Sequence, residues 1–150
     1  MDSGNIGFVL LCAAFVFVMT PGLAMFYGGL VRKKNVVNTM MTSIFIIGVG
    51  IVMWVLFGYS LSFAPSGNAF IGDFRWLGLE GVSLTEGYTD DASIPNMVFS
   101  AFQMMFAVIT PALITGAVAG RMKFKSIFVF TIFWSLIVYY PLAHMVWGPV

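Results

Sequence analysis

Residues 101–120 read AFQMMFAVITPALITGAVAG, and this apolar run contains no charged side chain. A transmembrane helix needs about 20 predominantly apolar residues, so the run is long enough to cross a bilayer. A single strand would leave its backbone groups unpaired in lipid, and a helix is therefore the predicted structure. One amide, Gln103, interrupts the run. Phe102 and Phe106 stand four positions apart beside it, which places both rings on one helix face.

Three further apolar stretches of this kind occur in the chain, and none of the four carries a formal charge. The chain has 150 residues, of which 60% are hydrophobic and 9% are charged. A soluble domain carries about 25% charged residues, so the composition predicts an all-α integral membrane protein with four transmembrane helices. A long connection at about 64–93 separates the second span from the third. The spans are expected at about 6–31, 40–63, 94–120 and 127–146.

The charged residues are distributed unevenly over the connections. Six of the seven basic residues lie in the two short connections, namely Arg32, Lys33, Lys34, Arg121, Lys123 and Lys125. The long connection holds most of the acids, namely Asp73, Glu80, Glu86, Asp90 and Asp91. Basic loops stay on the cytoplasmic side of a membrane, so residues 32–34 and 121–125 are predicted to be cytoplasmic. The N-terminus and the long connection are then outside, in a multi-pass protein of the plasma or inner membrane.

The sequence contains few residues that could carry covalent chemistry. The spans hold no Asp or Glu, no Cys/His cluster suggests a metal site, and no glycine loop precedes a Lys-Ser or Lys-Thr pair. The single cysteine, Cys12, cannot form an intrachain disulfide and is expected to pack in the interior. A net charge of +1 indicates no nucleic-acid partner. We therefore expect no enzyme activity, no metal and no cofactor.

Several polar and aromatic residues within the spans have two interpretations each. Gln103 needs hydrogen-bond partners in lipid, so it forms an interhelix hydrogen bond or lines a wet pore. Taken alone, the Phe102 and Phe106 pair is typical of core or lipid-facing positions. Trp147 stands at a span end, where tryptophan commonly anchors a helix at the interface, and His144 is typical of a satisfied packing residue.

Three separate stretches together resemble the Amt/Mep/Rh family of ammonium transporters. They read MTPGLAMFYGGLVRKKN at 19–35, AFQMMFAVITPALITGAVAGRMKF at 101–124 and PLAHMVWG at 141–148. Their order and spacing agree with the family, and the resemblance extends from about Asp2 to Gly148. It implies that the chain is the N-terminal part of an ammonium transporter domain. These four helices would belong to the first half of an eleven-helix channel built from inverted repeats.

The resemblance also implies a function and a site. Family members move ammonium or ammonia through a hydrophobic pore that has an aromatic recruitment site at its external mouth. Phe102 and Phe106 match the pair of stacked phenylalanines that closes the pore, and Trp147 matches the tryptophan of the recruitment site. Gln103 matches a neighbour of that gate. Homotrimers and a cytoplasmic PII-type regulator are typical of the family, which serves nitrogen uptake.

Some family features are absent from this sequence. The two pore histidines lie in later portions of the family's chain, and His144 is not one of that pair by position. We therefore expect the chain to be a fragment or one piece of a split protein. Two alternatives stay open: a membrane ammonium sensor or regulatory or structural subunit on the same scaffold, and an unrelated four-helix bundle.

The charge distribution leads to a labelling prediction. A cysteine introduced near Lys33 or Lys123 should react only with reagents on the cytoplasmic side, and one near Asp90 only with external reagents. The physical reason is the retention of basic loops in the cytoplasm. Labelling of both basic loops from outside would reverse the predicted orientation.

Overall fold

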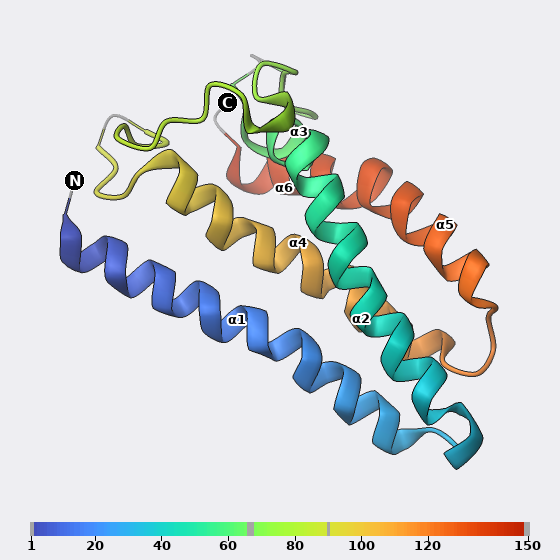
Figure 1. The fold of residues 1–150 in the computed structure, drawn as a ribbon. Helices are drawn as coiled ribbons and strands as arrows, with labels where there is room; N and C mark the ends of the chain where they lie inside the picture. Colours follow the sequence, from blue (N-terminus) through green and yellow to red (C-terminus); the bar gives the residue numbers. More distant parts are fainter. Residues whose placement is uncertain (1, 66–67, 90, 149–150) are drawn as a thin grey trace.

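The computed structural model describes residues 2–65, 68–89 and 91–148, so Asp90 of the long connection lies outside the described residues. Within these ranges four helical segments are long and apolar enough to cross a membrane. The two short connections lie at one end of the bundle and the long connection lies at the other (Figure 1). The prediction of an all-α chain with four membrane-spanning helices is confirmed.

Two of the four spans are built from more than one helix. The helices are α1 (Ser3–Leu30), α2 (Val36–Met53), α3 (Tyr59–Phe63), α4 (Asn96–Val118), α5 (Phe124–Trp134) and α6 (Tyr140–Trp147). A π-helical turn at Trp54–Gly58 joins α2 to α3, and another at Ser135–Tyr139 joins α5 to α6. The second turn is followed closely by Pro141, which has no backbone N–H to continue the hydrogen-bond ladder. Short 3₁₀ turns occur at Lys33–Asn35 and Leu77–Leu79.

Local residues explain where α1 begins and where α4 ends. α1 starts at Ser3, earlier than the expected position 6, because the Asp2 carboxylate accepts a hydrogen bond from Gly4 N at 2.9 Å. Such a cap satisfies one of the free N–H groups at a helix start. α4 ends at Val118, two residues before Gly120, whose φ of 71° is a left-handed conformation that often follows a helix end.

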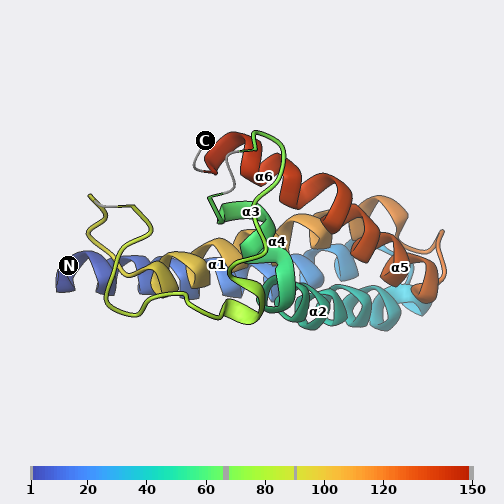
Figure 2. The same cartoon turned by 90° about the horizontal axis from the view of Figure 1, so that it is seen from above.

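Small residues let the helices approach one another closely. α1, α2 and α4 pack against each other, and α6 packs against α3, to one side of that trio (Figure 2). Gly116 of α4 faces the ring of Tyr27, whose hydroxyl donates a hydrogen bond to the Leu113 carbonyl at 3.0 Å. The buried hydroxyls of Ser43 and Thr115 lie 3.1 Å apart and join α2 to α4. Small residues and polar pairs of this kind hold membrane helices together.

α1 presents much of its apolar surface to the outside of the chain. Its exposed large side chains include Phe8, Phe15, Met25 and Phe26. Cys12 on this helix is partly exposed, so the prediction of an interior position for Cys12 is wrong. The physical reason is that α1 contacts only α2 and α4 extensively, which leaves its other faces uncovered by the described residues.

An aromatic cluster orders the long connection at its end of the bundle. This loop aromatic cluster comprises Trp54, Tyr59, Phe63, Trp76, Tyr88 and Phe99. Trp76 stacks on Tyr59 with ring centroids 5.4 Å apart, and Tyr88 stacks on Phe99 at 4.7 Å. Tyr59 also donates a hydrogen bond to the Asn96 side chain. Burial raises the pKa of the Tyr88 phenol, whose hydroxyl has no hydrogen-bond partner among the described residues.

The close approach of Gly58 to Tyr140 leads to a stability prediction. A Cβ added at Gly58 would lie 2.7 Å from the Tyr140 ring, which is only 2% exposed and has little room to move. We expect Gly58→Ala to destabilise the fold by about 1–3 kcal/mol, as overpacking does. Gly48→Ala on the same span is the matched control, because no atom lies within 4 Å of its added Cβ. Thermal unfolding in detergent measures both, and equal midpoints would contradict the packing assignment.

Candidate functional site

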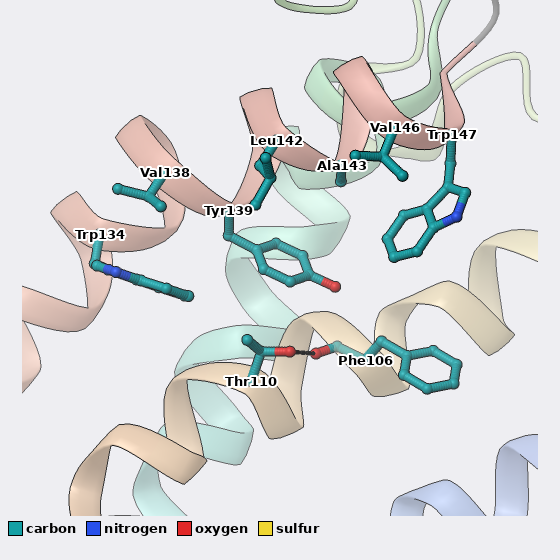
Figure 3. Close-up of a pocket in the computed structure, with 9 residues that line it drawn as sticks. All are labelled: Phe106, Thr110, Trp134, Val138, Tyr139, Leu142, Ala143, Val146 and Trp147. Carbon is teal, nitrogen blue, oxygen red and sulfur yellow. Dashed lines mark hydrogen bonds between the residues drawn. The ribbon is translucent and has the colours of Figure 1, made fainter. Parts of the chain in front are cut away.

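An apolar groove separates α4 from the α5–α6 span. Its volume is about 330 Å³, and it is partly open to the outside of the chain. Its lining residues are Phe106, Thr110, Trp134, Val138, Tyr139, Leu142, Ala143, Val146 and Trp147 (Figure 3). We call this feature the α4–α6 groove. No Asp, Glu, His, Lys, Arg or Cys is among these lining residues, and the polar side-chain groups on the groove are the Tyr139 and Thr110 hydroxyls and the Trp134 and Trp147 indole N–H groups.

Two of the predicted site residues face this groove from different helices. Phe106 projects from α4 and Trp147 from the last turn of α6, and Figure 3 shows them at the same end of the groove. Phe106 is 37% exposed and Trp147 is 60% exposed, so neither ring is enclosed by this chain. The tertiary structure thus brings together two rings that are 41 positions apart in the sequence.

The two phenylalanines of α4 contact each other, but their rings are not parallel. The ring centroids of Phe102 and Phe106 lie 5.1 Å apart with an interplanar angle of 81°. This edge-to-face arrangement is one of the two geometries that aromatic pairs prefer. Phe102 does not line the α4–α6 groove. A face-to-face stack is therefore not formed by these two rings, and their role as a gate stays a prediction.

Gln103 is a predicted site residue that the structure does not place on the groove. Its side chain is partly exposed and makes no hydrogen bond to any residue that the structure describes. It is also not among the residues that line the α4–α6 groove. The interhelix hydrogen bond expected as one interpretation of Gln103 is therefore absent from the described part of the chain. Its proposed place beside the gate stays a prediction.

The groove contains residues that the sequence reasoning did not select. Tyr139 points from the α5–α6 span toward α4, and Trp134 occupies the far end of the groove (Figure 3). The Thr110 hydroxyl donates a hydrogen bond to the Phe106 carbonyl at 2.7 Å, so its donor is used within α4 itself. A signal was present in the sequence, because Trp134, Val138 and Leu142 recur at a helical spacing of four.

His144 belongs to the same helix as Trp147 but points away from the groove. It is fully buried at 0% exposure, and both ring nitrogens face backbone carbonyls of other segments. This agrees with the interpretation of His144 as a satisfied packing residue. Packing alone would not require both ring nitrogens to face carbonyl oxygens.

The geometry restricts what the α4–α6 groove can accept. Its walls offer aromatic faces and aliphatic side chains, so it favours a small apolar or neutral solute over a hydrated ion. A cation could be attracted only at the end where the Trp147 and Phe106 rings stand, through the negative faces of the rings. Deeper in the groove a bare charge would lack partners and would be strongly disfavoured.

Comparisons with known proteins identify the relatives of this chain. The sequence profile of the Ammonium Transporter Family matches residues 7–150. The chain is 49% identical over 148 residues to an ammonium transporter of Bacillus subtilis (strain 168), covering 99% of the chain and 36% of that transporter. It is 43% identical over 147 residues to ammonium transporter 1 of Dictyostelium discoideum, covering 98% of the chain and 32% of that protein.

A solved structure shows the same arrangement of helices. The crystal structure of Saccharomyces cerevisiae Mep2 matches with a TM-score of 0.86 at 35% sequence identity. The match covers 99% of the chain and 35% of the Mep2 chain. The chain therefore spans about a third of the length of the relatives that it matches.

The open groove leads to an accessibility prediction. In the intact protein that contains this chain, with Cys12 replaced by alanine, Thr110→Cys should react with methyl methanethiosulfonate, a small neutral thiol reagent. Its side chain lines the groove. Thr115→Cys, which is buried at 2% exposure, is the control and should not react. Equal protection of both thiols would mean that another segment fills the groove.

Proposed function

Because the chain belongs to the ammonium transporter family, we propose that the intact protein containing it moves ammonium or ammonia across a membrane. The path includes the α4–α6 groove, and Trp147 and Phe106 stand at its entrance. The protein acts as a transporter and catalyses no covalent chemistry. The observation that carries this proposal is the pairing of two partly exposed aromatic rings at one end of a groove with uncharged, largely apolar walls.

The chemistry of ammonium fits this groove in two steps. A cation over an aromatic face gains about 0.5–2 kcal/mol, with tryptophan the strongest partner, so the entrance attracts ammonium before it enters. A charge inside an apolar lumen is costly, and the neutral ammonia molecule passes such walls far more readily than the ion. The Phe106 ring, in edge contact with the Phe102 ring, narrows the path at this entrance as a gate, and Gln103 serves the polar surroundings of that gate.

The orientation of the chain in the membrane is also part of the proposal. The chain is a multi-pass membrane protein, and we place it in the plasma or inner membrane with its N-terminus outside. In support, Arg32, Lys34 and Arg121 come from the two short connections and line one shared surface groove of about 460 Å³. These residues mark the cytoplasmic end, since basic residues are retained there. Trp147 then lies at the outer end, where ammonium would be captured.

Assembly and regulation form a further part of the proposal. A homotrimer would cover part of the apolar surface of α1, on which Phe8 and Phe26 are 67% and 60% exposed. The remaining exposed apolar side chains contact lipid. A PII-type regulator would dock on the cytoplasmic face, where the basic connections lie.

Two substitutions at the entrance test the function. In the intact protein, Trp147→Leu should raise the apparent KM for methylammonium uptake by up to about 30-fold, which corresponds to about 2 kcal/mol of lost cation–π attraction. Phe106→Ala should instead admit water to the narrow part of the path and weaken discrimination against potassium, or abolish flux through collapse. Uptake into proteoliposomes, with and without competing potassium, measures both effects.

A matched control separates the site from general packing. Phe133→Ala removes a ring that is 58% exposed and lies outside the α4–α6 groove, so uptake should stay at the parent level. Parent-level uptake and selectivity in both entrance variants would make the two rings ordinary packing residues. Ammonium binding without any flux in the parent protein would favour the sensor alternative.

A further inference from the structure

Helix α6 contacts the α2–α3 span at two places. Tyr140 of α6 covers Gly58, the last residue of the π-helical turn before α3, and one turn further along His144 of α6 reaches the carbonyl of Ser62 in α3. Both pairs advance by four residues on each side, so the two contacts lie on one face of each helix. The first contact is apolar and the second is polar. The polar contact is the one nearer to Trp147.

His144 makes two contacts at this point. Its Nδ1 lies 3.1 Å from the Ser62 carbonyl oxygen, and its Nε2 lies 2.8 Å from the Asn68 carbonyl oxygen. Ser62 stands in the last turn of α3, where helix carbonyls lack partners from their own helix. Only a ring that is protonated on both nitrogens donates to both carbonyls, and a neutral ring donates to one at a time. The side chain thus joins α6 to the end of α3 and to the segment that follows it.

The same turn of α6 carries Trp147. The Gly148 N–H donates to the His144 carbonyl at 2.8 Å, so Trp147 is held between two residues that contact each other. A Cβ at Gly148 would lie 2.5 Å from His144 Nδ1, which shows how closely the backbone passes the ring. The Trp147 ring is 60% exposed and gains little packing of its own in this chain. Its position over the groove therefore depends on the backbone of this turn.

We propose that His144 is a positioning residue for Trp147. Through a ring N–H that donates to the Ser62 or the Asn68 carbonyl, according to the tautomer, it holds the last turn of α6 and sets where the Trp147 ring stands at the entrance of the α4–α6 groove. This inference rests on the proposed transport function, since Trp147 is assigned there to cation capture. It adds a role for a buried residue that does not itself contact the groove.

Three substitutions at His144 separate the hydrogen bonds from the packing. His144→Phe keeps an aromatic ring of similar shape and removes both ring nitrogens, and with them the donated hydrogen bond. His144→Asn places an amide N–H₂ near the position of Nδ1, within reach of the Ser62 carbonyl, and His144→Gln places one near Nε2, within reach of the Asn68 carbonyl. Each amide variant therefore restores one of the two contacts.

The first measurement is methylammonium uptake by the intact protein in proteoliposomes. His144→Phe should raise the apparent KM by about tenfold, the effect of losing a net hydrogen bond that positions the ring, and leave Vmax within about twofold. The apparent KM values of His144→Asn and His144→Gln should both lie between those of the parent and of His144→Phe. A merely structural role would instead lower the amount of folded protein, and Vmax with it, at an unchanged KM.

The second measurement does not depend on transport. A nitroxide attached at Met145→Cys, in a background without other cysteines, reports the mobility of the last turn of α6 by its EPR line shape. Met145 is 45% exposed and lies outside the α4–α6 groove, so the label leaves the lining intact. His144→Phe should make the label more mobile, and the two amide variants should restore part of the order.

A second variant covers the case in which His144→Phe fails to fold. Gly148→Ala keeps the histidine, and its backbone φ of −69° suits any residue, but the added Cβ would crowd Nδ1. Like His144→Phe, it should raise the apparent KM and make the nitroxide label more mobile. Unchanged KM and line shape in all these variants would overturn the positioning role while leaving transport intact. If the parent protein shows no flux but the variants still change the EPR line shape, the proposed transport function is wrong and the role of His144 in holding the last turn of α6 stands.

Discussion

Lipid offers no hydrogen bonds, and this constraint governs how the helices of the chain meet. Apolar surface gains little by moving from lipid to a protein interior, so close packing and interhelix polar contacts must hold the helices together. The structure meets this demand with glycines that receive aromatic rings, as Gly58 receives Tyr140. It adds buried polar joints such as Ser43 with Thr115. The broad apolar faces of α1 take no part in this packing.

The arrangement gives the two ends of the bundle different properties. At the end that carries the long connection, the loop aromatic cluster and the two contacts of His144 attach this irregular connection to the helices. At the other end, basic side chains from two short connections gather around a polar groove. In the proposed path, a cation reaches the Phe106 and Trp147 ring faces of the α4–α6 groove before it reaches an apolar wall.

Parts of the candidate site were accessible to sequence reasoning and parts were not. Phe106 and Trp147 were selected, and the structure places both on the groove. Phe102 and Gln103 were selected with them, yet neither lines it, because the part of α4 that lines the groove begins at Phe106 and both residues lie about one helical turn before it. Tyr139 was missed, since a tyrosine in an apolar span carries no local sign of the surface that it faces.

The sequence by itself determined the membrane class, the number of spans and the predicted direction of the chain. These depend on the length of apolar runs and on where charges stand, and both properties are local. Only the tertiary structure decided which rings share the groove, how the Phe102 and Phe106 rings are angled and what His144 contacts. These features join segments up to 82 positions apart, as between His144 and Ser62. Such pairings depend on how the helices pack, and no local pattern of residues records that.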